Sequence, residues 1–577
     1  MTNAIYLTTS EPYAGKSIIA LGLVNLLAAR TEKIAYFKPV ISGERNQKDH
    51  HLDTVSKHFK LHIPYEDMFV FTRNEVVKHI NAGNEAYFID TVIDRFKRLQ
   101  EKNDFVLVEG TDFVSGSTNL EYDGNISIAK NLGIPAAIII KADGKSVSQI
   151  VDTALSTVKS FTNEGVQVLT VIANKIDIEQ EENIRTQLEK ALPKGILVTS
   201  IPAKKDLGSP TMREIVDTVE GNVLVGEHLL SNQVDNSIVG AMQLHNCLTR
   251  LSDNTLIVTS GDRGDIIIGA LQANLSKNYP KVAGLLLTGG LKPEQTILNL
   301  IEGLDTQVPI VLVKTGTFKT VARVANVQSR ISADNKEKIL LAIGMFDKYV
   351  DVKTLEKKII SFRTTNITPR MFQYQLVKRA KESKKHIVLP EGDDDRILMA
   401  ANELIKQNVV DLTILGHKDS VEASLKRLNI SLDLEKVKII NPATSDRFEE
   451  YVNTLYELRK HKNMTLEVAR ELMVDVSYFG TMMVYKGEAD GMVSGASHTT
   501  QHTIRPALQF VKTRPGVSTV SSVFFMCLPN RVSVFGDCAV NTNPTSEQLA
   551  DIAISSADTS KMFNIEPRIA MLSYSSG

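Results

Sequence analysis

The chain has 577 residues, 43% of them hydrophobic, which is enough for several domains with substantial cores. A formal net charge of −1 does not favour nucleic acid or a membrane surface as a partner, and no apolar run is long enough to span a membrane. Three cysteines, Cys247, Cys527 and Cys538, lack metal-ligand spacing and fit a reduced, cytoplasmic enzyme. Because Cys527 and Cys538 lie in apolar, strand-like runs, we expect both to be buried, inert thiols.

The first 210 residues alternate short apolar runs with amphipathic stretches. This alternation predicts a parallel sheet with helices on both faces. The predicted strands are 4–8, 34–38, 105–109, 136–141, 168–174 and 196–201. Ligands of such sheets bind at the carboxyl ends of the strands, so the polar residues that follow each strand are the ones of interest.

A phosphate-binding loop is predicted between the first strand and the next helix. It contains Gly15, Lys16 and Ser17, and this Gly-Lys-Ser order places backbone N–H groups and a lysine around phosphates. The Ser17 hydroxyl is suited to Mg²⁺. Ser10 stands where the usual loop has its first glycine, so close approach of the backbone there is an open question.

Two more strand ends carry polar groups, Lys38 with Ser42 and Gly43, and Glu109 with Gly110. With the Gly15-Lys16-Ser17 loop, they resemble dethiobiotin synthetase, an ATP-dependent enzyme. The resemblance implies a nucleotide-binding domain, with a regulatory nucleotide and Mg²⁺ as its ligands and the Glu109 carboxylate as a metal ligand.

The strand predicted at 168–174 ends at Asn174, and Lys175 and Asp177 follow it. This spacing is the one by which some nucleotide-binding domains bind a guanine base. A strand that ends in an Asn/Lys turn also arises without that role, and both interpretations stay open.

The segment 211–335 has the pattern of a smaller α/β unit. Runs at 256–259 and 285–288 predict strands that lead into glycine-bearing turns, Asp262-Arg263-Gly264-Asp265 and Gly289-Gly290. The segment resembles the module named for its Asp-Arg-Thr-Gly-Gly motif, with Gly264 in place of the threonine. The resemblance implies a regulatory or assembly role, whereas tight turns alone would also explain the glycines.

A charged helical connector leads to the strand predicted at 386–390. The acidic turn that follows runs from Glu391 to Arg396. We interpret its carboxylates as helix caps that complement the helix dipole, rather than as a metal site.

A polar loop follows an apolar strand that ends at Val493. Its small residues, beginning with Ser494, would let backbone N–H groups approach a ligand, and Arg505 complements phosphate or carboxylate oxygens. Pro506 is suited to the first turn of a helix. An ordinary strand–loop–helix junction is the alternative. The sequence identifies no partner for His498 or His502, so we assign neither a general-base role.

Three motifs in the last third of the chain resemble phosphate acetyltransferases. They are Asp490 to Pro506, Gly536 to Leu549, and Pro567 to Ser575. The resemblance implies reversible acetyl transfer between coenzyme A and phosphate, with acetyl-CoA and phosphate as small-molecule substrates and no tightly bound cofactor or metal. It also implies a homo-oligomer with a functional link to acetate kinase. The implied substrate-binding residues are Arg459, Ser494, Thr499, Thr500, Arg505, Asn541, Ser573 and Ser575.

These segments predict a multi-domain α/β protein. It has a parallel-sheet, P-loop-like domain at 1–210, a small α/β regulatory domain at 211–335, a connector at 336–369 and an α/β phosphate acetyl/butyryl transferase domain at 370–577. The chain ends shortly after a strand predicted at 569–573, which in a parallel sheet needs a crossover connection. In the family the Ser-Arg pair and the Asp assigned to catalysis come later, so we expect this domain to be incomplete and inactive alone.

Two other functions remain open from the sequence. One is a nucleotide-dependent ligase of the dethiobiotin synthetase type, which rests on Gly15, Lys16 and Ser17. The other is a non-catalytic protein that binds a metabolite or takes part in assembly. The ligase explains none of residues 370–577, and in the non-catalytic protein the first two segments would bind a metabolite while the remainder only docks.

Overall fold

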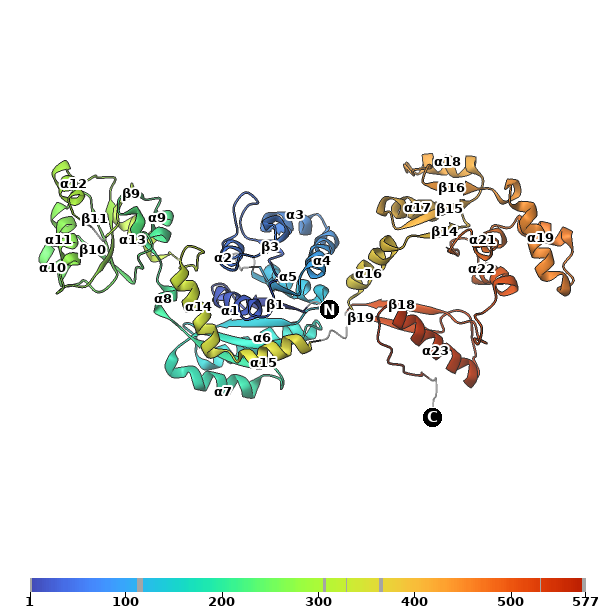
Figure 1. The fold of residues 1–577 in the computed structure, drawn as a ribbon, viewed down its shortest axis with the longest axis horizontal. Helices are drawn as coiled ribbons and strands as arrows, with labels where there is room; N and C mark the ends of the chain where they lie inside the picture. Colours follow the sequence, from blue (N-terminus) through green and yellow to red (C-terminus); the bar gives the residue numbers. More distant parts are fainter. Residues whose placement is uncertain are drawn as a thin grey trace. The chain divides into compact units, whose positions relative to one another are not determined.

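The computed structural model describes residues 3–111, 118–304, 308–327, 329–362, 367–529 and 531–572. It divides into two compact units, Met1–Thr364 and Thr365–Gly577. Both contain helices and strands packed around sheets, so the predicted α/β class is confirmed (Figure 1). Within the described residues, no helix is both long and apolar enough to cross a membrane.

The first unit begins with a six-stranded sheet in the order β2-β5-β1-β6-β7-β8, and every pairing in it is parallel. Its strands are β1 (Asn3–Thr9), β2 (Ile34–Phe37), β5 (Phe105–Glu109), β6 (Ala136–Lys141), β7 (Val168–Ile176) and β8 (Leu197–Pro202). All six predicted strands are confirmed, with ends that differ by one or two residues. A short pair, β3 (Val40–Ile41) and β4 (Phe71–Thr72), lies beside it.

One face of this sheet carries the main core of the unit. The core joins alternate strand residues such as Ile5 and Leu7 to α1 (Lys16–Ala28), α14 (Lys336–Tyr349) and α15 (Val352–Ser361). Residues 336–361, predicted as connector, therefore supply Phe346 and its neighbours to the core of the N-terminal sheet. The other helices around the sheet are α2 (His50–Phe59), α3 (Arg73–Asn81), α4 (Glu85–Lys102), α5 (Thr118–Leu132), α6 (Val147–Asn163), α7 (Glu181–Ala191) and α8 (Lys205–Gly208).

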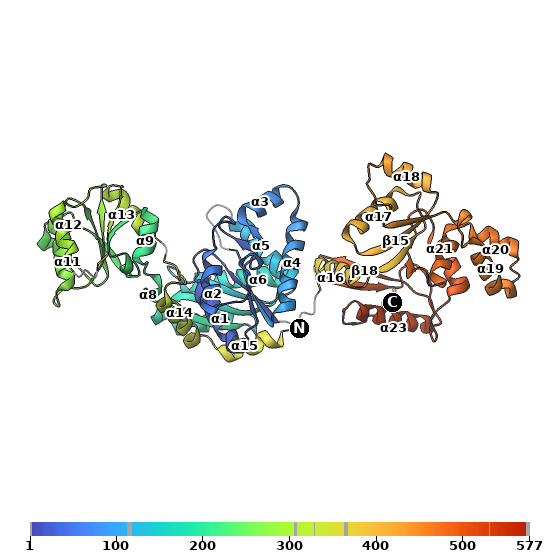
Figure 2. The same cartoon turned by 45° about the horizontal axis from the view of Figure 1, so that its top comes forward.

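A second sheet in this unit has the order β10-β11-β12-β13-β9, with β9 antiparallel to β13. Its strands are β9 (Asn222–Val225), β10 (Asn236–Val239), β11 (Thr255–Ser260), β12 (Val282–Thr288) and β13 (Ile310–Leu312). Helices α9 (Met212–Val219) and α13 (Thr317–Ala325) cover one face, and α10 (Leu244–Leu248), α11 (Gly264–Leu275) and α12 (Gln295–Glu302) cover the other (Figure 2). The smaller α/β unit predicted here is confirmed.

The second unit contains a parallel sheet in the order β16-β15-β14-β17. Its strands are β14 (Lys385–Leu389), β15 (Val410–Leu415), β16 (Val437–Ile440) and β17 (Gly491–Met492), and its helices are α17 (Asp395–Gln407), α18 (Lys418–Arg427), α19 (Phe448–Arg459), α20 (Leu466–Met473), α21 (Val476–Tyr485) and α22 (Thr500–Pro506). Because β14 pairs with both β15 and β17, the loops that follow β14 and β17 lie side by side.

The rest of the second unit surrounds an antiparallel two-stranded ribbon. It comprises α16 (Pro369–Glu382), β18 (Val523–Leu528), β19 (Arg531–Gly536) and α23 (Ser546–Met562). The predicted burial of Cys527 is wrong, because it lies on an exposed face of this ribbon; Cys538 is half-buried. Apolar sequence alone does not bury a strand that has only one neighbour.

The strand predicted at 569–573 is also wrong over its described part. Residues 569–572 form no strand, and the Leu572 side chain is 88% exposed. A strand needs a neighbour for its backbone N–H and C=O groups, and no described residue pairs with this segment.

The contact between α1 and α14 gives a test of this packing. A Cβ added to Gly22 of α1 would lie 2.0 Å from Cγ of Phe346, whereas one added to Gly344 of α14 would have nothing within 4 Å. We expect Gly22→Ala to destabilise the first unit by about 1–3 kcal/mol through overpacking. Gly344→Ala should instead stabilise it by about 0.5–1 kcal/mol, since alanine favours helix. Thermal denaturation, with the first unit's transition assigned by limited proteolysis, measures both, and equal effects would contradict the packing described.

Candidate functional site

A buried carboxylate joins the two adjacent loops of the second unit. Glu391 comes two residues after β14, and its side chain is fully buried. Its Oε2 accepts hydrogen bonds from the backbone N–H groups of Gly495 (2.9 Å) and Ala496 (2.8 Å). Its Oε1 accepts from those of Ser497 and His498, both at 2.8 Å. Four consecutive N–H groups of the loop after β17 thus bind one carboxylate.

This arrangement changes two interpretations. The loop N–H groups of residues 495–498 bind Glu391, so the expectation that they approach a ligand directly is wrong. Glu391 is not a helix cap either, whereas Asp394 is, because its carboxylate accepts from the Arg396 N–H at the start of α17. Burial opposes the charge of Glu391, but the backbone N–H groups and His498 lower its pKa to about 2. The carboxylate is therefore ionised at neutral pH.

Helix α22 starts earlier than the sequence predicted. Thr499 is its N-cap, with Oγ1 accepting from the His502 N–H at 3.3 Å, and Thr500 is its first residue. Pro506 lies at the last position of α22 rather than in the first turn, so that prediction is wrong. Ser494 accepts a hydrogen bond from the Thr503 hydroxyl at 3.2 Å, which closes the loop onto the helix.

Both histidines of this loop have partners that the sequence did not reveal. His498 Nδ1 lies 2.9 Å from Glu391 Oε1, and the His498 ring stacks on the His502 ring with centroids 4.6 Å apart. His502 lies between Asp475, with Nε2 3.0 Å from Oδ2, and the Ser477 hydroxyl, 3.1 Å from Nδ1. The statement that neither histidine has a partner is wrong, because the partners are distant in sequence.

Arg459 and Arg505 both act electrostatically on the hydroxyl of Tyr478. Arg459 donates to the Gln509 carbonyl oxygen at 3.2 Å, and the Tyr478 hydroxyl donates to Gln509 Oε1 at 3.1 Å. Burial raises the pKa of Tyr478, and the positive charges of Arg505 and Arg459 oppose that rise. Arg505 is exposed, and Nε of Arg459 is buried without a hydrogen-bond partner among the described residues. The two arginines thus place two positive charges beside α22.

Asn541 lies in a separate loop, after β19. Its side-chain amide donates to Asp537 Oδ2 at 2.7 Å and to the Val520 carbonyl oxygen at 2.8 Å. That it lines the same cleft as Arg505 stays a prediction. Ser573 and Ser575 lie outside the described residues.

In the first unit, the predicted phosphate-binding loop has the expected backbone. Gly15 is left-handed, with φ of 86°, and α1 begins directly at Lys16. The Lys16 ammonium donates to the Gly110 carbonyl oxygen at 2.6 Å and lies 3.1 Å from Glu109 Oε1. The lysine therefore points to the carboxyl end of β5, and Glu109 balances its charge.

Glu109 is the centre of a buried cluster. Burial alone would raise its pKa, but His51, Lys16 and Lys38 hold it well below the usual value. His51 Nδ1 lies 2.9 Å and Lys38 Nζ 3.4 Å from Glu109 Oε1. Ser17 is 3.4 Å from the other nitrogen of His51. Glu109 and Ser17, the two oxygen donors predicted for Mg²⁺, therefore both contact His51.

The turn predicted at Asn174 is wrong, because Asn174 and Lys175 lie inside β7. The Asn174 amide donates to the Ala14 carbonyl oxygen at 2.8 Å and so holds the phosphate-binding loop. Burial lowers the pKa of Lys175. Asp177 caps a short 3₁₀ helix by accepting from the Glu179 N–H. Binding of a base by Asn174, Lys175 and Asp177 stays a prediction.

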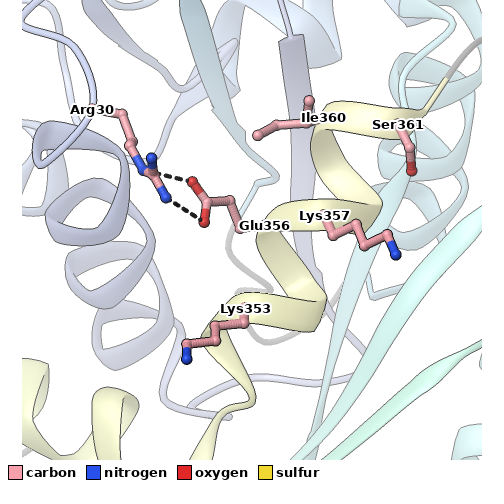
Figure 3. Close-up of a pocket in the computed structure, with 6 residues that line it drawn as sticks. All are labelled: Arg30, Lys353, Glu356, Lys357, Ile360 and Ser361. Atoms are coloured by element: carbon pink, nitrogen blue, oxygen red, sulfur yellow. Dashed lines mark hydrogen bonds and ion pairs between the residues drawn. The ribbon is translucent and has the colours of Figure 1, made fainter.

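A cavity of about 460 Å³ lies between Arg30 and α15, and none of its lining residues is a predicted site residue (Figure 3). Arg30 and Glu356 form a two-point ion pair across it, with Nε–Oε1 at 2.9 Å and Nη2–Oε2 at 3.1 Å. Lys353 and Lys357 complete its charged wall. Across the described part of the chain, no group of three His, Cys, Asp or Glu side chains is placed to hold a metal ion.

The comparisons with known proteins agree with the order of segments. Residues 371–577 match the family described as phosphate acetyl/butaryl transferase, 214–327 the DRTGG domain and 3–211 an AAA domain. Phosphate acetyltransferase from Synechocystis sp. is 44% identical over all of this chain and 83% of its own length. The chain belongs to the phosphate acetyltransferase family. The Nitratidesulfovibrio vulgaris member is 41% identical over all of this chain and 82% of its own length.

Two solved structures of the family are similar to part of the chain. The EutD phosphotransacetylase from Staphylococcus aureus is 44% identical, with 35% of this chain and 61% of that one covered and a TM-score of 0.32. A phosphotransacetylase from Streptococcus pyogenes is 42% identical, with 36% and 64% covered and a TM-score of 0.34. The match thus spans less than two thirds of either structure.

The low pKa of Glu391 leads to a pH-dependent prediction. A carboxylate whose pKa falls on folding contributes stability above about pH 4.5 that is lost as the pH drops towards 2. We expect Glu391→Gln to destabilise β14 and β17. The loss of stability relative to wild type should be about 0.8 kcal/mol smaller at pH 4 than at pH 6. Hydrogen exchange of peptides from these strands, compared between variant and wild type at each pH, measures the change. A deficit independent of pH would contradict an ionised Glu391 in the loop.

Proposed function

We propose that this chain supplies the substrate site for reversible transfer of an acetyl group between coenzyme A and phosphate, located at α22 and the adjoining loops. That residues 370–577 are inactive alone stays a prediction. Membership of the family supports the reaction. The observation that carries the site is the position of exposed Arg505 on α22, directly after a loop that Glu391 binds, with Arg459 adding a second positive charge that acts on Tyr478. Two anionic substrates require such a concentration of positive charge.

Each predicted residue has a role in this proposal. Arg505 is exposed on α22 and binds a phosphate group, while Arg459, tied to the Gln509 carbonyl oxygen, supplies the second charge. The hydroxyls of Ser494, Thr499 and Thr500 add hydrogen bonds to the same oxygens. The resemblance supports Asn541, Ser573 and Ser575 as further lining of the cleft. The site would then accelerate acetyl transfer by holding the thiolate of coenzyme A close to the acyl carbon of acetyl phosphate.

Coenzyme A acts here as a substrate and not as a bound cofactor. A homo-oligomer, a cytoplasmic location, a functional link to acetate kinase and the domain boundaries drawn from the sequence are part of the proposal. Family resemblance supports the homo-oligomer and the link to acetate kinase, and the low cysteine content supports the cytoplasmic location.

Binding of a nucleotide with Mg²⁺ by the first unit is a second proposed function. Left-handed Gly15 and Lys16 at the start of α1, at the carboxyl edge of a parallel sheet, support it. Ser17 and Glu109 offer oxygen donors of the kind Mg²⁺ prefers. The Lys16 ammonium contacts the Gly110 carbonyl oxygen and Glu109, so the nucleotide has to draw it away from them.

In a protein that also carries the family's catalytic Ser-Arg pair and Asp, Arg505→Ala should lower kcat/KM for acetyl transfer roughly ten- to hundredfold, because a charge-assisted contact with phosphate contributes about 1.5–3 kcal/mol. Exchange of labelled phosphate into acetyl phosphate, dependent on coenzyme A, measures this effect. Arg514→Ala removes another exposed arginine a short distance along the chain and should leave exchange unchanged. Equal losses in the two variants would place Arg505 outside the site.

Lys16→Ala should abolish measurable binding of ATP or GTP, because Lys16 supplies the charge that the phosphates require. Calorimetric titration of the full chain with each nucleotide and Mg²⁺ tests this. Lys33→Ala is the control, since Lys33 is exposed and precedes β2, at the amino end of the sheet. The absence of heat with wild type would leave this unit without a nucleotide function and would not affect the acetyl-transfer proposal.

A further inference from the structure

The loop between β17 and α22 is held from one side by Glu391. All four donors, the N–H groups of residues 495–498, point at the two oxygens of this one side chain. The Ser497 hydroxyl adds a fifth hydrogen bond at 3.2 Å. A single side chain thereby determines the backbone path of the loop.

A second contact holds the same loop by its carbonyl group. Arg396 donates to the Ala496 carbonyl oxygen, and its guanidinium also pairs with Asp394, 2.7 Å away. Glu391 lies in the turn between β14 and α17, and Arg396 lies in the first turn of α17. Gly392 allows this turn to lie close to β15, since a Cβ there would be 2.5 Å from the Leu415 carbonyl oxygen. The turn after β14 is thus built to hold the neighbouring loop.

The held loop leads without interruption into the predicted substrate groups. His498, whose N–H and ring both contact Glu391, is followed directly by Thr499, the N-cap of α22. Thr500 and Arg505 are on that helix. The direction in which α22 leaves the loop, and so the position of Arg505, therefore depends on where residues 495–498 are held.

We infer that Glu391 is a positioning residue for acetyl transfer, which fixes the loop at 495–498 so that Thr499, Thr500 and Arg505 meet the substrate in a prearranged geometry. This inference rests on the proposed function. Gly495, with φ of 118°, makes the loop flexible by itself, and a group ordered before binding costs less to immobilise on binding. Because the loop N–H groups are occupied, the phosphate is bound by side chains.

Isothermal titration with coenzyme A separates positioning from simple stabilisation. The dissociation constant reports the geometry of the site, while the stoichiometry reports the fraction of folded protein. Glu391→Gln keeps the size of the side chain but turns an amide NH₂ towards backbone donors. We expect binding to weaken at least about tenfold with unchanged stoichiometry, as for loss of preorganisation. Asp393→Asn removes an exposed carboxylate of the same turn and should leave binding within about twofold.

A dissociation constant for Glu391→Gln within about twofold of wild type, with or without a fall in stoichiometry, would overturn the inference. If that variant does not fold, Arg396→Gln replaces it, since this side chain is 68% exposed and contacts the Ala496 carbonyl oxygen of the loop as well as Asp394. It should weaken binding in the same direction, and an unchanged dissociation constant would again overturn the inference.

A double variant tests whether Glu391 acts through Arg505. In Glu391→Gln/Arg505→Ala, the combined loss of affinity should be clearly smaller than the product of the two single losses, because both remove the same contact. Losses that multiply would overturn the inference. If wild type does not bind coenzyme A, both the inference and the proposed function fail. If wild type binds coenzyme A and the Glu391 and Arg396 variants bind it equally well, the proposed function stands and the inference alone fails.

Discussion

The second unit depends on one interaction, a buried carboxylate that binds four consecutive backbone N–H groups of the neighbouring loop. An ionised side chain is costly to bury unless hydrogen bonds replace its water, and the loop N–H groups are equally costly to leave unpaired. The hydrogen bonds between Glu391 and the N–H groups of residues 495–498 satisfy the carboxylate and the loop backbone at once. The strand order makes this possible, because β17 pairs directly with β14 and the two loops emerge at the same edge.

The first unit also contains a buried carboxylate, but side chains rather than backbone N–H groups surround it. There a carboxylate at the end of β5, Glu109, lies among the cations Lys16, Lys38 and the ring of His51. In both units the charged groups stand at the carboxyl ends of parallel strands, where side chains from separate loops converge. The two units differ in whether the cation predicted to bind phosphate is exposed to solvent. Lys16 is buried and paired, whereas Arg505 is exposed beside the held loop.

Much of the architecture follows from local patterns. The six strands of the first sheet were predicted within a residue or two, because buried parallel strands form continuous apolar runs separated by helical segments. Where a run lacked neighbours, the same reasoning failed. Residues 569–572 are apolar but form no strand, and Cys527 is exposed on a two-stranded ribbon. Whether a run becomes a buried strand depends on what pairs with it, which lies elsewhere in the chain.

The sequence by itself determined the fold class, the order of the segments, the family and the motif containing Arg505, because each depends on short-range patterns or on motifs. Tertiary structure alone decided how those residues are used. The partners of Glu391 are more than a hundred positions away, His502 meets Asp475 on another helix, and Lys16 meets a carboxylate from β5. No local pattern records such contacts, since strand order and helix packing bring these groups within hydrogen-bonding distance only when the chain has folded.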